Sequence, residues 1–224
     1  MARDTLTRDQ IVRTAVELLD DDGLEGLNMR ALGKRLGAAP TAVYWHVKTK
    51  DELVLLAGDR VWDEIELADP GAPDDWRTAA TQLAAGLHAL FARHPWLVQA
   101  FGSYLFYGPG KARFDDRCLA VYESAGFTAP QADRAAAAVF TYVLGSALAG
   151  AADVSLARRL NRQGDAEEQI RRTMAKAREV AAEFPRLRAR LDTPADDYNA
   201  APEQTFEHGL QALLDGLAAA PGGR

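Results

Sequence analysis

The segment from Leu27 to Lys50 constrains the fold more than any other part of the chain, because it predicts two short helices joined by a tight corner. Gly37 can adopt the left-handed backbone conformation that ends a helix, and Pro40 suits the first turn of the next one, where its missing N–H costs nothing. Leu32 and Val43 give the corner an apolar inner side. This pattern is typical of a helix-turn-helix, whose second helix enters the major groove of DNA.

The distribution of charge favours the same interpretation. From Leu24 to Lys50 the chain has five Lys or Arg residues and one acid, a net charge of +4, whereas the whole chain carries −6 and the remainder therefore −10. A small basic module in an acidic protein keeps the phosphate-binding surface local. Because a helix–glycine–helix corner also occurs in proteins that do not bind DNA, this charge pattern is what indicates a nucleic-acid partner.

Side chains of the second short helix can contact both bases and backbone. The Thr41 methyl group and Ala42 can contact a thymine methyl group, and Arg30 can reach a guanine edge or a phosphate. Trp45 fits either packing between helices or contact with DNA. We predict that the DNA-binding residues, of which the last four mainly bind phosphates, are Arg30, Pro40, Thr41, Ala42, Tyr44, His46, Lys48 and Lys50.

The rest of the chain has helical periodicity without strand patterns, so we predict an all-α fold. The segment Asp69–Asp75 interrupts the helices with two prolines and a glycine. We place the domain boundary there. Residues 1–68 are predicted to form an N-terminal helix-turn-helix DNA-binding domain with a connecting helix. Residues 69–224 are predicted to form a C-terminal helical bundle for ligand binding and dimerisation, and the 48 % of apolar residues suffices for its core.

Several helix ends are also predictable. Thr7 and Gln10 fit a capping box at the first helix, and Asn28 fits the cap of the second. The first helix is expected to end at Asp20–Gly23, where acidic residues oppose the helix dipole. The fourth is expected to run from about Asp51 to Ala68.

The segment Ala135–Ala152 is uncharged over 18 residues, about the lower limit for a membrane span. It consists mostly of alanine and is bracketed by Asp133, Arg134 and Asp153, so we predict instead a helix buried on both sides in a soluble bundle, with no membrane partner. The chain opens without an apolar signal segment, and its single cysteine, Cys118, fits a reducing compartment. We therefore expect a cytoplasmic location.

Aromatic residues are concentrated in the middle of the C-terminal half. One interpretation is an ordinary core, and the other is a cavity for a flat apolar molecule with a few polar contacts. The candidate ligand-binding residues are Trp96, Phe101, Tyr104, Tyr107, Phe114, Cys118, Tyr122, Phe140 and Tyr142.

The sequence lacks the patterns of common catalytic and metal sites. Its four histidines are not spaced as in a zinc site, and it has no paired CxxC motif and no Gly-rich phosphate loop. We therefore predict that the protein is not an enzyme and uses no metal or cofactor. A small-molecule enzyme or carrier built on a helical bundle stays open as the alternative outside transcription.

With these motifs in view, the chain resembles the TetR family of bacterial one-component transcriptional regulators and is tetracycline-repressor-like over about residues 7–66. The resemblance implies a ligand-responsive repressor that binds a palindromic operator on double-stranded DNA and is released by a small, apolar or aromatic effector. An activator with the same head is the alternative. The segments that carry the likeness are Leu27–Leu32, Leu36–Gly37, Val43–Lys50 and, more weakly, Gly126–Phe127 and Tyr142–Gly145.

The resemblance also implies a homodimer with a four-helix interface, to which each chain contributes about Pro130–Ala152 and Glu203–Ala218. The interface residues expected from it are Phe140, Leu144, Leu148, Leu210, Leu213, Leu214 and Leu217. The tetracycline repressor binds a magnesium–drug chelate through a histidine and an acid. Here the position of the acid falls on or near Ala149, and no histidine occurs between His94 and His208, so we do not expect a tetracycline–magnesium ligand.

Overall fold

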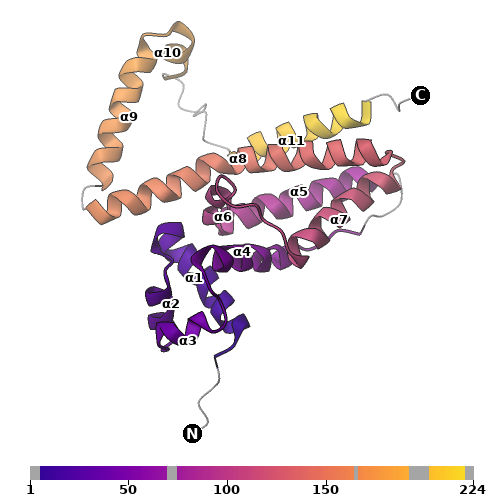
Figure 1. The fold of residues 1–224 in the computed structure, drawn as a ribbon. Helices are drawn as coiled ribbons and strands as arrows, with labels where there is room; N and C mark the ends of the chain where they lie inside the picture. The colour runs from indigo at the N-terminus through magenta and orange to yellow at the C-terminus, as the bar shows by residue number, and fades with distance from the viewer. Residues whose placement is uncertain (1–5, 70–74, 164–165, 192–201, 220–224) are drawn as a thin grey trace.

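A computed structural model describes residues 6–69, 75–163, 166–191 and 202–219 (Figure 1). Within these ranges every regular element is a helix, which confirms the predicted all-α class. The first helices gather at one end of the molecule and form its head (Figure 1). They are α1 (Arg8–Gly26), α2 (Met29–Arg35), α3 (Pro40–Tyr44) and α4 (Lys50–Val61), followed by the 3-10 turn η1 (Trp62–Glu64).

The remaining helices form a bundle above the head, in which α5, α7 and α11 pack against the long α8. In Figure 1, α9 and α10 extend away from this bundle. The elements are α5 (Trp76–Arg93), α6 (Pro95–Ala100), α7 (Pro109–Ser124), α8 (Ala129–Gln163), α9 (Ala166–Ala182), α10 (Pro185–Leu191) and α11 (Pro202–Ala219).

The caps of the head helices agree with the sequence. The Gln10 backbone N–H donates to Thr7 Oγ1 at 3.2 Å, while the Gln10 side chain accepts from the Thr7 backbone at 2.9 Å, which completes the capping box. Asn28 Oδ1 accepts from the Ala31 N–H at 2.9 Å and caps α2. Gly37 has φ +62° and Pro40 is the first residue of α3, so the predicted corner is confirmed.

One predicted helix end is confirmed in part and one is wrong. The regular first helix breaks at Gly23, as predicted, because its φ of +71° and ψ of −173° are not helical, but a further helical segment continues to Gly26. The fourth helix ends at Val61 and not at Ala68. After it the chain tightens into η1 and becomes extended at Ile65, which places both the Trp62 and Ile65 side chains in the core.

In the single chain, α8 is not buried on both sides as predicted. Its stretch Ala129–Asn161 is long and apolar enough to cross a membrane by composition, yet only 22 % of its most apolar 18-residue window is buried. The neighbouring helices cover Val139 and Val143 but leave another face open. That open face carries Gly145, Leu148, Ala149 and Ala152.

The large apolar residues along α9 and just after it face solvent. Ile170, Met174 and Phe184 are all exposed, because α9 leaves the bundle (Figure 1). α9 ends at Ala182, and Pro185 opens α10. Most of the predicted boundary segment, residues 70–74, lies outside the described residues.

Candidate DNA-binding surface and ligand cavity

The corner between α2 and α3 is held from inside by apolar side chains and presents polar ones outside. Leu32, Val43 and Val47 are fully buried. Gly33 lies so close to the following turn that a Cβ atom there would meet the Ala38 carbonyl oxygen at 2.8 Å. Because the corner is fixed in this way, the outer face of α3 is presented rigidly to a partner. Its exposed residues are Pro40, Thr41, Tyr44, Trp45 and Lys48.

The basic side chains of the head fall into two groups. Arg30 and Lys34 are exposed and form no ion pair with any residue that the structure describes, so both can bind phosphate. Lys48 is also exposed, with its Nζ 2.9 Å from the Tyr44 carbonyl oxygen. Lys50 Nζ, by contrast, donates to the Leu24 carbonyl oxygen at 2.5 Å and ties α4 to the end of α1.

A buried histidine joins the head to the bundle. His94, between α5 and α6, is 6 % exposed; its Nδ1 lies 2.7 Å from Asp20 Oδ1 of α1 and its Nε2 lies 3.1 Å from Glu64 Oε2 of η1. Burial alone would lower the pKa of His94, but the hydrogen bonds and charges of the two carboxylates outweigh it and raise this pKa. Trp96 Nε1 donates to the same Asp20 oxygen at 2.8 Å, so the junction is a connected polar network.

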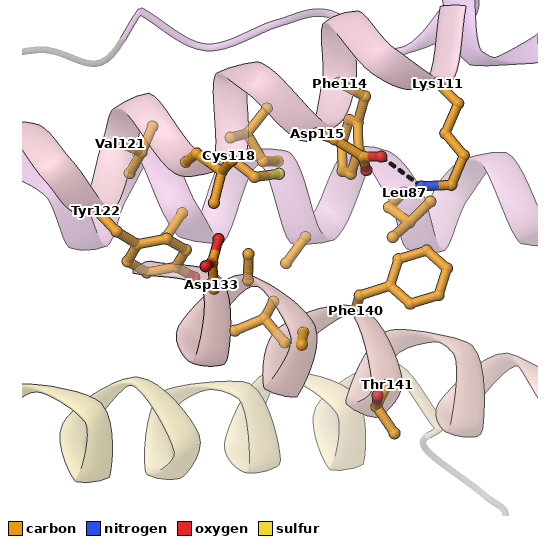
Figure 2. A pocket seen from close by; sticks show the side chains of 17 residues that line it. Leu87, Lys111, Phe114, Asp115, Cys118, Val121, Tyr122, Asp133, Phe140 and Thr141 are labelled. Atoms are coloured by element: carbon orange, nitrogen blue, oxygen red, sulfur yellow. Dashed lines mark hydrogen bonds and ion pairs between the residues drawn. The ribbon is translucent and has the colours of Figure 1, made fainter. Parts of the chain in front are cut away.

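A cavity of about 350 Å³ lies between α5, α7 and α8 (Figure 2). Its middle is apolar, with Leu83 and Leu87 from α5 and Phe114 from α7 among the lining residues. Polar side chains lie at its two ends (Figure 2). Lys111 and Asp115 are at one end, with Lys111 Nζ 2.5 Å from Asp115 Oδ2.

The opposite end of the cavity carries the Cys118 thiol, the Tyr122 phenol and the Asp133 carboxylate (Figure 2). Burial raises the pKa of Cys118 to about 12 and also raises the pKa of Tyr122 above its ordinary value. Both groups are therefore neutral near neutral pH. A cavity with an apolar middle and a few polar groups suits a flat organic molecule.

The first turn of α7 connects this cavity to the head. The Lys111 backbone N–H donates to Asp59 Oδ1 of α4 at 3.0 Å, and Lys111 Nζ lies 5.5 Å from the Trp62 ring centroid. Gly110 allows this approach, since a Cβ atom there would meet the Asp59 carbonyl oxygen at 2.3 Å. Arg113 pairs with Asp63 beside it. A displacement of α7 would therefore also displace the last turn of α4.

Two family models match the chain. The model for bacterial regulatory proteins of the tetR family matches residues 11–57, and the model for the tetracyclin repressor-like C-terminal domain matches residues 69–220. The chain belongs to the TetR family. This TetR-family protein is therefore a transcriptional regulator with a DNA-binding helix-turn-helix head, which confirms the family expected from residues 27–50.

Relatives extend over nearly the whole chain. An HTH-type transcriptional regulator of Saccharopolyspora erythraea is 35 % identical over 97 % of this chain and 86 % of its own length. The HTH-type transcriptional repressor DrrR1 of Streptomyces coeruleorubidus is 31 % identical over 95 % of this chain and 77 % of its own. The structure is similar to that of the TetR family protein ActR of Streptomyces coelicolor in complex with actinorhodin. That likeness has a TM-score of 0.77 and 28 % identity, and it covers 98 % of this chain and 99 % of that one.

The TetR-family head places most of the predicted DNA-binding residues on one accessible surface. Arg30, Pro40, Thr41, Tyr44 and Lys48 are exposed, while Ala42 and His46 are half-buried beside them. The exception is Lys50, whose ammonium group is already used to hold α1 to α4. Trp45 is 81 % exposed, which excludes packing between helices and leaves contact with DNA as the remaining alternative for this side chain.

The structure brings only part of the predicted aromatic set to the cavity. Phe114, Cys118, Tyr122 and Phe140 line it. The others are placed elsewhere by their own contacts. Trp96 is in the domain junction, and Phe101 packs against the rings of Phe91 and Phe140. The Tyr104 hydroxyl donates to Asp51, Tyr107 is exposed, and the Tyr142 hydroxyl donates to the Phe206 carbonyl oxygen of α11.

Sequence reasoning also missed lining residues of α5 and α8. Leu83, Leu87 and Asp133 gave no signal, because an apolar stripe that lines a cavity has the same spacing as one that packs a core. Lys111 was missed as well. Its proximity to the ring of Phe140, 5.5 Å away, depends on how α7 and α8 pack together.

The predicted dimer residues must be corrected in part. Leu210 and Leu214 are 1 % and 0 % exposed within one chain, where they pack in the core, so they have no surface to offer a second chain. Phe140 points into the cavity (Figure 2). Residues that keep some exposure, and stay predictions as interface contacts, are Leu144, Leu148, Leu213 and Leu217.

Proposed function

We propose that this protein is a cytoplasmic repressor that binds a palindromic operator as a homodimer and is released when a small aromatic effector fills the cavity between α5, α7 and α8. The observation that carries this proposal is that Lys111 contacts both the cavity and the head. Its side chain lines the cavity, and its backbone N–H donates to Asp59 of the head. Support also comes from relatives, because DrrR1 is named a repressor and ActR was solved with actinorhodin.

The mechanism follows from this connection. In the effector-free dimer the two α3 helices lie about 34 Å apart and enter successive major grooves. The effector is expected to bind more tightly when α7 is shifted than when α7 is in its effector-free position. The shift of α7 then moves α4 through the contacts with Asp59 and Trp62, and the two heads lose the spacing that DNA requires. A coupling free energy of about 1–3 kcal/mol is usual, and a full switch needs about 5.5 kcal/mol.

Binding to DNA is tested with a mobility shift on the DNA upstream of the protein's own gene. If about six phosphates are neutralised, the affinity falls roughly 10³-fold between 50 and 200 mM salt. A helical-bundle enzyme or carrier with an incidental basic corner shows no such binding. Deletion of the gene then raises the output of a reporter under a repressor and lowers it under an activator.

The dimer is tested on the open face of α8. No atom lies within 4 Å of a Cβ added at Gly145, so Gly145→Arg leaves the single chain intact but blocks close approach of a second α8. We expect the variant to be monomeric by light scattering and to bind the operator at least about tenfold more weakly. The matched control is Gly150→Arg, equally free of contacts and about 140° around the helix. A dimeric Gly145→Arg protein would place the interface elsewhere.

The cavity is tested by filling it. Ala136 lines the cavity from α8, and Ala136→Trp places an indole in a space of about 350 Å³. We expect binding of the fluorescent probe N-phenylnaphthylamine to weaken at least about tenfold, because the apolar space is occupied. The control Ala157→Trp puts the same ring on the exposed side of α8. Unchanged probe binding in Ala136→Trp would show that this cavity is not the site.

A further inference from the structure

The polar groups at the two ends of the cavity differ in whether other side chains of the protein pair with them. At the α7 end, the charges satisfy each other, since Lys111 Nζ bonds to Asp115 at 2.5 Å and lies 5.5 Å from the ring centroids of both Trp62 and Phe140. The ammonium group there has a carboxylate and two aromatic faces as partners. A ligand gains little by adding another charge at this end.

At the other end the polar groups lack partners. Tyr122 is 2 % exposed, yet its hydroxyl makes no hydrogen bond within the part of the chain that the structure describes. Asp133 of α8 lines the same end (Figure 2) and forms no ion pair with any described residue. Because the Tyr122 hydroxyl can form a hydrogen bond that no described residue supplies, a ligand with a polar group at this end of the cavity is favoured.

The net charge of the side chains that line the cavity indicates which charge a ligand should carry at the Tyr122 end. The acidic and basic side chains that line the cavity are Lys111, Asp115 and Asp133, whose formal charges sum to one negative charge. With Lys111 and Asp115 paired, the excess negative charge belongs to Asp133. A carboxylate on the ligand would be repelled there, whereas an ammonium group would be attracted and would also supply hydrogen-bond donors.

We propose that the effector is a planar aromatic compound that carries a protonated alkylamine, whose ammonium group pairs with Asp133 and donates to the Tyr122 hydroxyl oxygen. Its rings lie in the apolar middle of the cavity, between Leu87 and Phe114, and its far edge approaches the neutral Lys111–Asp115 pair. This inference rests on the proposed function, because it assigns a ligand class to the same cavity.

The test uses three probes of nearly equal shape and different charge, namely anthracenylmethylamine, anthracenylmethanol and anthracenecarboxylate. Each is titrated against the full-length protein by fluorescence. We expect the amine to bind about fivefold more tightly than the alcohol and the carboxylate to bind most weakly. This preference shrinks in high salt, because Asp133 is exposed to solvent and its charge is screened.

Variants separate the charge from the shape. In Asp133→Asn the advantage of the amine over the alcohol is lost, while the affinity for the alcohol stays. Asp116→Asn is the matched control, because it removes the same charge from an exposed position of α7 that does not line the cavity. In Tyr122→Phe the amine alone loses affinity, by about twofold to fivefold.

The outcomes distinguish the two proposals. Equal binding of the three probes, abolished by Ala136→Trp, would overturn the amine while leaving the cavity as the effector site. Tightest binding of the carboxylate would also overturn the amine. If none of the three probes binds, or if Ala136→Trp does not weaken their binding, the cavity is not the effector site. Either result would also contradict the proposed function.

Discussion

A single carboxylate on the tip of α3 is expected to abolish operator binding. In Thr41→Asp the new charge lies on the exposed α3 surface that we propose faces the phosphates, in a head whose exposed cations Arg30 and Lys34 supply positive charge. Repulsion by DNA and neutralisation of these cations should weaken binding at least about 100-fold. The fold should be unaffected, because an acid in the first turn of a helix interacts favourably with its dipole. A mobility shift gives the affinity, and thermal unfolding gives the stability.

The comparison needs a variant with the same net charge. Gln82→Asp adds one negative charge at an exposed position of α5, far along the chain from the head. It should reduce operator affinity less than about threefold, since charges beyond a Debye length are screened. Equal losses in both variants would mean that overall charge, and not the α3 surface, controls binding.

The second large effect is expected at the junction of head and bundle. Both ring nitrogens of His94 face carboxylates, and only the imidazolium can donate to both. Because the pKa of His94 is raised in the folded protein, the stability that it supplies is complete below its ordinary value and is lost as pH rises through the raised value. We expect the free energy of unfolding to fall by about 1–2 kcal/mol more in the wild type than in His94→Gln between about pH 6 and pH 9.

Urea unfolding at both pH values measures this difference. Glu64 is partly solvated, and the expected size is reduced accordingly. His208→Gln is the control, because His208 is exposed on α11. Parallel pH dependence in wild type and His94→Gln would show that the histidine stays neutral and only fills space.

The head was predictable because its signals are local. The capping box of Thr7, the Asn28 cap and the Gly37 corner each depend on residues within a few positions, and the backbone rules that they follow need no tertiary information. The end of α4 was not predictable in this way. Its helical pattern continues to Ile65, but the packing of Trp62 against Phe114 of α7, with ring centroids 5.0 Å apart, requires the chain to turn.

The cavity and the dimer face were predicted less well for a different reason. A leucine stripe such as that of Leu210 and Leu214 shows that a helix buries one face, but not whether its own chain or a second chain covers it. Aromatic residues raise the same difficulty. Tyr142 and Trp96 have polar atoms that bond to distant segments, at Phe206 and Asp20, and sequence spacing cannot reveal these partners.

The burial of Cys118 has a consequence for how the protein responds to reactive compounds. A pKa of about 12 keeps this thiol protonated, and a thiol reacts with oxidants and alkylating agents through its thiolate. The cavity can therefore admit a quinone or another electrophile beside Cys118 without capturing it covalently. Occupancy stays reversible, and the regulator can return to its DNA once the compound has left the cell.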